Sequence, residues 1–232
     1  MRIDILTLFP GLFQNFMAES MISIALKAKA LSLRIVNIRD YTQDRHRTAD
    51  DYPYGGGAGM IMKPEPLYEA ITSCLGETKK PVIYFTPQGR LLKQEIVWNY
   101  SQEKELILLC GHYKEIDQRI RDTLVTDELS IGDYVLSGGE IPAMVFIDAL
   151  ARLLPGVLND IDSALTDSHQ NGLLGSPHYT RPPDFMGLKV PEVLLSGNHQ
   201  NIDLWRQEKS VEITRRNRPD LYRAWKRKKQ SE

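Results

Sequence analysis

Short apolar runs alternate with amphipathic segments along the first two thirds of the chain. Apolar and β-branched runs predict five strands, at 2–9, 31–38, 81–85, 105–110 and 124–131. Segments with helical spacing lie between and after them, at 12–31, 64–75, 91–100, 115–123 and 140–154. Strands that alternate with helices form βα units, so the pattern predicts an α/β fold with a mostly parallel sheet.

Three of the predicted strands end in loops that suit ligand binding. The loops occupy 86–89, 111–113 and 138–139, and the ends of parallel strands gather at one edge of a sheet. The stretch 130–142 is the most specific of them, with small residues, the pair Gly138-Gly139, and then Glu140 and Pro142 where a helix begins. Glycines allow a ligand to approach the peptide groups closely, so these loops predict one pocket lined by backbone.

The pattern changes after residue 155. Residues 161–174 are polar and lack periodicity, which predicts an interdomain linker that orders when a ligand binds. Helical segments follow at 191–195, 198–216 and 219–228, with Asn217 as the expected N-cap of the last one. We therefore predict an α/β domain at 1–160, the linker at 161–174, and a helical domain at 175–232.

Charge is distributed unevenly between the two parts of the chain. Residues 206–232 hold ten Lys or Arg and four Asp or Glu, a net charge of +6, whereas the other residues carry −7. Tyr222 and Trp225 lie among these basic residues. A basic segment with interleaved aromatic residues is typical of a nucleic-acid partner, and a solvated helix face is the alternative interpretation.

Composition excludes several classes of protein. The hydrophobic fraction of 42% and charged fraction of 25% are those of an ordinary globular domain. Cys74 and Cys110 are the only cysteines, and neither their spacing nor that of the five histidines fits a metal site. No apolar run is long enough to span a membrane, and the N-terminus is a poor signal peptide, so we expect a cytoplasmic protein.

The glycine-rich stretch 51–60 fits no nucleotide-binding motif. It has neither the GxGxxG spacing of a dinucleotide site nor the GxxxxGK[ST] pattern of a P-loop. Its glycines fit a backbone that a ligand approaches closely and, equally well, a flexible surface loop. Arg152 and Asp167 are candidates for chemistry, although a helix C-terminal cation and a turn carboxylate are the ordinary roles of such residues.

Eight segments, taken together and in order, resemble a known family. They are 53–60, 84–89, 110–113, 130–142, 167–168, 172–174, 177–182 and 196–199. Across nearly the whole chain the sequence resembles the bacterial TrmD-type tRNA (guanine-N1)-methyltransferases of the SPOUT superfamily. This resemblance implies a deep trefoil knot in the α/β domain, a rare exception to unknotted topology.

The same resemblance implies an activity and its partners. The enzyme would transfer a methyl group from S-adenosylmethionine to N1 of guanosine 37 in tRNA, next to the anticodon. It would act as a homodimer with the active site at the interface, with Mg²⁺ as a further component. The basic C-terminal domain would bind the tRNA.

The resemblance also assigns roles to residues. Asp167 would be the general base, and Arg152 would be its electrostatic partner. The substrate tRNA would contact Ser168, His178, Arg181, Asn198 and His199. The cofactor pocket would be lined by Tyr84, Phe85, Thr86, Pro87, Gly89, Gly111, Tyr113, Glu115, Ile131, Gly132, Tyr134, Leu136, Gly138, Gly139 and Pro142.

The chain departs from the family pattern at three positions. Lys114-Glu115 stands where an acidic residue and then glycine are usual, so Glu115 is expected to replace the acidic contact. Ala58 replaces a common proline, which loosens its loop, and Gly175 replaces a common acid.

Three alternatives stay open at this point. One is a SPOUT-type methyltransferase that acts on a different RNA position, and another is an RNA-binding module without catalysis. A nicotinamide oxidoreductase is more distant, because no strand–GxGxxG–helix unit is present.

Overall fold

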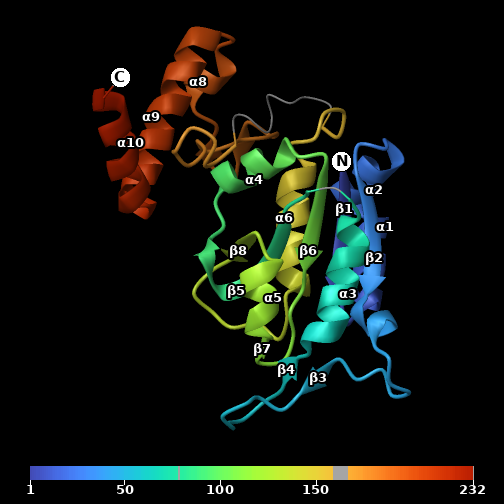
Figure 1. Ribbon diagram of the computed structural model, residues 1–232. Coiled ribbons are helices and arrows are strands. Elements are labelled where there is room, and N and C mark those ends of the chain that lie inside the picture. The colour runs from blue at the N-terminus through green and yellow to red at the C-terminus, as the bar shows by residue number, and fades with distance from the viewer. Residues whose placement is uncertain (78, 159–166, 232) are drawn as a thin grey trace. The chain divides into compact units, whose positions relative to one another are not determined.

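The computed structural model describes residues 1–77, 79–158 and 167–231. The chain divides into two compact units, Met1–Asn159 and Asp160–Glu232, which Figure 1 colours from blue to yellow and from orange to red. The first unit holds the predicted sheet, and the second is mainly helical.

A five-stranded parallel sheet forms the centre of the first unit (Figure 1). The strand order is β2-β1-β6-β5-β8, and every neighbouring pair in it is parallel. The predicted α/β fold with a mostly parallel sheet is thus confirmed. The strands are β1 (Arg2–Thr7), β2 (Ser32–Asn37), β5 (Val82–Leu91), β6 (Glu105–Leu109) and β8 (Asp127–Ser130).

Most helices of the first unit lie where the apolar spacing predicts them. Two further short segments, η1 (Pro10–Leu12) and η2 (Ile38–Tyr41), are 3-10 helices. The predicted helix at 12–31 is broken, because Glu19 is extended with ψ of 161° and Ser20 has φ of +53°. The segments are η1 (Pro10–Leu12), α1 (Phe13–Ala18), α2 (Ser20–Lys27), η2 (Ile38–Tyr41), α3 (Pro64–Leu75), α4 (Gln94–Ser101), α5 (Gln118–Thr123) and α6 (Glu140–Ala151).

A second, small sheet corrects the prediction of a helix at 115–123. Here β7 (Glu115–Ile116) pairs in parallel with β4 (Ile61–Met62), and β4 pairs antiparallel with β3 (Asp50–Asp51). The helix starts only after Asp117, whose carboxylate accepts a hydrogen bond from Arg119 N at 2.9 Å and caps it. The glycine-rich stretch 52–60 is therefore the loop of a β-hairpin.

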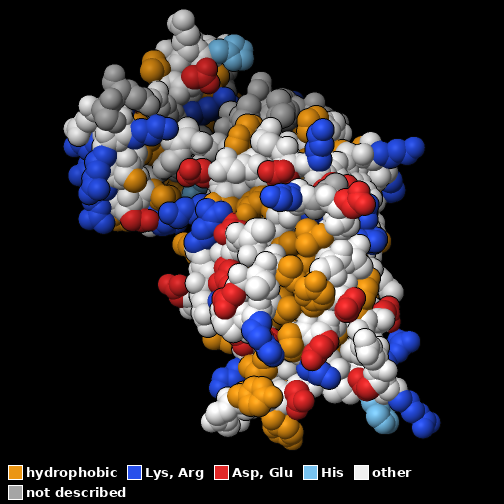
Figure 2. Space-filling view, viewed as in Figure 1, with side chains coloured by type: hydrophobic (Ala, Val, Ile, Leu, Met, Phe, Trp, Pro, Cys, Tyr) orange, Lys and Arg blue, Asp and Glu red, His pale blue; other side chains and the backbone are white. Residues whose placement is uncertain are grey.

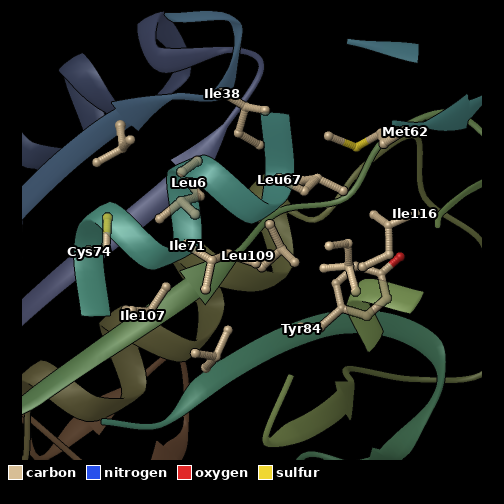
Figure 3. Close-up of a cluster of buried hydrophobic side chains, with 14 of the residues drawn as sticks. Leu6, Ile38, Met62, Leu67, Ile71, Cys74, Tyr84, Ile107, Leu109 and Ile116 are labelled. Atoms are coloured by element: carbon tan, nitrogen blue, oxygen red, sulfur yellow. The ribbon is translucent and has the colours of Figure 1, made fainter. Parts of the chain in front are cut away.

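Helices cover both faces of the large sheet. Side chains alternate along each strand, so each strand contributes apolar residues to both faces. On one face Leu6 and Ile107 belong to the same buried cluster as Leu67 and Ile71 of α3 (Figure 3). On the other face the ring of Phe85 lies 6.0 Å from that of Phe146 in α6. Strands buried on both faces explain the continuous apolar runs in the sequence.

The two cysteines are buried in the first unit and form no disulfide. Burial raises the pKa of the Cys110 thiol well above its usual range, so this side chain is a neutral apolar residue. None of the helices among the described residues is both long and apolar enough to cross a membrane.

Within residues 167–231, the second unit contains a short hairpin and three helices. Its elements are β9 (Asp184–Phe185), β10 (Leu188–Lys189), α8 (Glu192–Leu195), α9 (His199–Asn217) and α10 (Pro219–Ser231). The prediction that Asn217 caps the last helix is wrong, because α9 continues through this residue.

The predicted linker falls partly outside the described residues. Residues 161–166 are not described, whereas 167–174 belong to the second unit. Leu173 is buried there, and Leu174 N donates to Thr214 Oγ1 of α9 at 2.8 Å. The end of the predicted linker is thus packed on α9.

Candidate functional site

A cavity opens at the carboxyl ends of β5, β6 and β8, where ligands bind in parallel α/β sheets. It brings together the predicted loops 111–113 and 138–139 with residues 84–87 of β5. The prediction of a loop at 86–89 is wrong, because β5 continues through these residues to Leu91 with an irregularity after Phe85. Of the fifteen residues expected to contact the cofactor, all but Gly89 line this cavity. Its lining is Tyr84, Phe85, Thr86, Pro87, Gly111, His112, Tyr113, Lys114, Glu115, Leu129, Ser130, Ile131, Gly132, Tyr134, Val135, Leu136, Ser137, Gly138, Gly139 and Pro142.

Two of the loops are joined by main-chain contacts at the cavity. Gly139 N donates to Gly111 O at 2.8 Å, and His112 and Gly138 form an antiparallel bridge. A Cβ atom on Gly139 would lie 2.8 Å from the Cα of Cys110, which is closer than such atoms approach one another. Glycine is therefore required here for the close approach of two chain segments.

The loop between β8 and α6, which leads to Gly138, folds back on itself through Gly132 and Tyr134. Gly132 has φ of +152°, and a Cβ atom on it would lie 2.5 Å from the ring of Tyr134. Ser130 Oγ donates to Gly132 O at 3.1 Å, which closes the turn. The remainder of this loop presents Val135 and Leu136 to solvent at the cavity edge, so the cavity has an apolar rim that is uncovered.

Buried polar atoms of Glu140 and His112 lie close to Gly138 at the cavity. Glu140, at the start of α6, accepts a hydrogen bond from Thr7 Oγ1 at 2.7 Å, and both side chains are buried. His112 Nδ1 is buried without a hydrogen-bond partner among the described residues. A Cβ atom on Gly138 would lie 2.4 Å from Glu140 Oε2 and 2.6 Å from this nitrogen, so both polar atoms face the space that Gly138 leaves.

One wall of the cavity carries a carboxylate, Glu115, in contact with a buried phenol. Tyr84 Oη donates to Glu115 Oε1, and Arg121 Nη1 lies 3.4 Å from Glu115 Oε2. Burial, and then the charge of Glu115, raise the pKa of the Tyr84 phenol well above its ordinary value. Tyr84 is therefore a neutral hydrogen-bond donor, and Glu115 is a charged acceptor that faces the cavity.

Gly89 lies away from the cavity. It lies within the irregularity of β5 between Phe85 and Arg90, and a Cβ atom on it would lie 2.5 Å from Leu129 N, so it packs directly against β8. Six cavity residues that the sequence analysis did not select are His112, Lys114, Leu129, Ser130, Val135 and Ser137. Each is adjacent in sequence to a selected residue or to another of the six, and this was the available signal, because a short segment that lines a cavity brings successive residues to it.

The residues expected to carry the chemistry lie in different units. Arg152 is the C-cap of α6 in the first unit, and Asp167 is the first described residue of the second. Ser168 Oγ accepts from Gly175 N at 2.8 Å, and the Asn198 side chain caps α9 through Asn201 N at 3.2 Å.

The other residues expected to contact tRNA are exposed in the second unit. His178, Arg181 and His199 all lie on its surface, and Arg181 precedes Pro182 through a cis peptide bond. Lys and Arg side chains gather on the face of this unit that Figure 2 shows. In the described residues no group of His, Cys, Asp and Glu is arranged to hold a metal ion.

Together, the parallel sheet and its strand-end cavity define an α/β protein with a ligand site lined by backbone. A family model described as tRNA (Guanine-1)-methyltransferase TrmD matches residues 1–224. A relative from Clostridioides difficile (strain 630) is 51% identical over 226 residues, which cover 96% of this chain and 98% of the relative. Another from Dehalococcoides mccartyi (strain ATCC BAA-2266 / KCTC 15142 / 195) is 52% identical over 223 residues, or 95% and 90% of the two chains. Both are named tRNA (guanine-N(1)-)-methyltransferase, and the chain belongs to the TrmD family.

Proposed function

We propose that this protein transfers a methyl group from S-adenosylmethionine to N1 of guanosine 37 in tRNA. Membership of a methyltransferase family implies this methyl donor, and the relatives are named for guanine N1 of tRNA. The observation that carries the proposal is the glycine-lined cavity, because its predicted cofactor residues converge there from β5 and from the loops that follow β6 and β8.

The residues of the cavity fit the donor chemically. Backbone groups of Gly111, Gly138 and Gly139 are approachable because no side chain fits at these positions. Leu129, Ile131 and Leu136 offer apolar contact to a flat base. Glu115 supplies a negative charge to a ligand that is positively charged. When bound, the donor supplies an electrophilic methyl group.

The chemistry on the tRNA side requires a base and a cation. N1 of guanine carries a proton at neutral pH, and the Asp167 carboxylate removes it as N1 becomes the nucleophile, which contributes about 10²–10⁴-fold. The Arg152 guanidinium stabilises the negative charge that develops toward O6. The target base leaves its stack, which is less costly in an anticodon loop than in a duplex.

We propose a homodimer in which two copies complete each site. Supporting it, the first unit exposes several apolar side chains: Phe9 and Leu12 after β1, and Ile141 and Val145 on α6. Large apolar side chains on exposed helix faces are typical of protein interfaces. Sedimentation at micromolar concentration measures the oligomeric state directly, and a monomer would contradict this part of the proposal.

The trefoil knot also belongs to this proposal. It is supported by the segment after β8, which returns to pair at His112 and Gly111 beyond β6 instead of staying beside β5.

The second unit is proposed to bind tRNA through its exposed basic helices. Mg²⁺ enters the proposal only as a component of the assay, because no metal-binding group occurs in the described part of the chain.

The test compares Asp167→Asn with Asp122→Asn, a matched change at an exposed carboxylate of α5. Asp167→Asn is expected to reduce methyl transfer about 10²–10⁴-fold and to retain donor binding, whereas Asp122→Asn retains both. Mapping of the methylated nucleotide in a tRNA transcript identifies the position. Full turnover by Asp167→Asn, or methylation elsewhere than guanosine 37, would overturn the proposal.

A further inference from the structure

Five side chains form a continuous polar network behind one wall of the cavity. We call Tyr84, Gln88, Glu115, Arg121 and Glu128 the Glu115 network. Arg121 donates to both oxygens of Glu128, from Nε at 2.8 Å and from Nη2 at 2.7 Å. The same Nη2 donates to Gln88 Oε1 at 3.0 Å, and Gln88 Nε2 donates to Glu115 Oε2 at 3.4 Å. The network thus joins β5, β7, α5 and β8 around the carboxylate of Glu115.

The partners of Arg121 decide the charge that reaches the cavity. Its bidentate bond to Glu128 is short, whereas its nearest approach to Glu115 is 3.4 Å. Arg121 is therefore neutralised mainly by Glu128, and the side-chain bond to Glu128 raises the pKa of the guanidinium. Two carboxylates share one guanidinium, so the network carries a net charge of −1, which falls on Glu115.

The residues around Glu115 reduce the screening of its negative charge by solvent. Tyr84 is 3% exposed, the Arg121 side chain is 7% exposed, and the guanidinium lies over the Tyr84 ring at 5.7 Å. The Glu115 side chain is 21% exposed, and Tyr84 and Glu115 both line the cavity. A charge in a partly buried wall acts more strongly on a ligand than the same charge on an open surface.

Among the described residues that line the cavity, Lys114 is the one Lys or Arg. It is exposed, and its Cβ and Cδ lie 3.3 and 3.6 Å from the Cβ position of Gly59 in the hairpin loop. Its stem thus runs along the hairpin, and its ammonium is screened by water. Lys114 weakens the field of Glu115 but does not cancel it.

We propose that the Glu115 network makes the cavity select the methyl donor over the demethylated product. This inference rests on the proposed function. S-adenosylmethionine carries a positive sulfonium, whereas S-adenosylhomocysteine has a neutral thioether and lacks the transferred methyl group. A fixed negative charge in the wall attracts the additional positive charge of the former, so Glu115 is a specificity-determining residue that favours release of the spent product.

The experiment measures the dissociation constants of both ligands by calorimetry, with no tRNA and no turnover. In Glu115→Gln, binding of S-adenosylmethionine is expected to weaken roughly tenfold, whereas that of S-adenosylhomocysteine changes less than about twofold. Asp122→Asn removes an exposed carboxylate of α5 and is the matched control, for which the ratio of the two constants stays at the wild-type value.

A second variant tests the inference independently, in case Glu115→Gln does not fold. Glu128→Gln leaves Arg121 to pair with Glu115, so the ratio is expected to shift in the same direction by a smaller factor. Thermal unfolding of each variant establishes that it is folded. An unchanged ratio in both folded variants would overturn the inference, as would an equal loss of both ligands in Glu115→Gln. Failure of the wild-type protein to bind either ligand would instead refute the proposed function.

Discussion

The side chains of Thr7 and Glu140 are 133 positions apart in the sequence and are joined by a buried hydrogen bond. Thr7 Oγ1 donates to Glu140 Oε1 at 2.7 Å, and Phe9 N donates to the same hydroxyl at 2.9 Å. The bond ties the end of β1 to the first residue of α6, directly beneath the Gly138-Gly139 segment. A carboxylate in this position also lies at the positive end of the helix dipole.

Loss of the Thr7 hydroxyl should destabilise the protein. Thr7→Val keeps the shape of the side chain but leaves the buried carboxylate of Glu140 without this donor, which costs about 1–3 kcal/mol of unfolding free energy. Thr7→Ser keeps the hydroxyl and is the control, with an expected loss nearer 1 kcal/mol for the missing methyl group. Urea unfolding measures both. Equal stability of the valine variant and the wild type would show that the bond contributes nothing.

A single methyl group at position 139 should weaken binding of the methyl donor. In Gly139→Ala the new Cβ would meet the Cα of Cys110 at 2.8 Å and Gly111 N at 3.1 Å, so the two loops must separate. We expect donor affinity to fall at least about tenfold. Gly11→Ala is the matched control, because a Cβ atom there meets nothing within 4 Å. Calorimetry with S-adenosylmethionine would contradict this expectation if both variants bound equally well.

Stability should fall in alkaline solution because of Tyr84. Burial, and then Glu115, raise the pKa of this phenol, so the folded protein retains a proton that the unfolded chain releases near pH 10. The folded state therefore binds more protons above about pH 10, and the free energy of unfolding decreases as the pH rises further.

The variant Tyr84→Phe isolates this effect. Its free energy of unfolding is lower at neutral pH, because the hydrogen bond to Glu115 is lost, but it should decline less steeply than the wild type above about pH 10. Tyr68→Phe, at a half-exposed tyrosine of α3, serves as the control and should decline like the wild type. Parallel curves for wild type and Tyr84→Phe would contradict the prediction.

The basic helix α10 should contribute to tRNA affinity through counterion release. The double change Lys226→Gln and Arg227→Gln removes two exposed cations, which should reduce the slope of log affinity against log salt by about 1.4–1.8. Lys27→Gln with Lys29→Gln removes two exposed cations at the end of α2 and is the control. Filter binding at several salt concentrations gives the slopes, and equal slopes for both doubles would exclude a specific role of α10.

The sequence predicted those elements that depend on local pattern. Helix α3 spans Pro64–Leu75, as expected, because Pro64 suits the first turn and its apolar face meets the sheet. The break at Glu19 was missed, since apolar spacing continues across it and only the backbone changes direction. The pairing of Glu115 with Ile61 was also missed, because contact between residues 54 positions apart leaves no periodic signal.

The candidate site was predictable for a different reason. The ends of parallel strands meet at one edge, so three segments far apart in the sequence could be assigned to one cavity. The same rule does not predict which side chains contact the cavity residues from outside the cavity. In the sequence Arg121 and Glu128 resemble ordinary surface charges, and only the fold brings them close to Glu115.

The pairing of Ile61 with Glu115 links the glycine-rich hairpin to the cavity wall. Lys114 N also donates to Met60 O at 3.1 Å, so the hairpin is joined by main-chain contacts to the strand that carries Glu115. Tyr52 and Tyr54 at the hairpin are largely exposed. A macromolecule that immobilises them also fixes the carboxylate on the other side of β7. By thermodynamic reciprocity, a small ligand held by that carboxylate then raises the affinity of the macromolecule by the same factor.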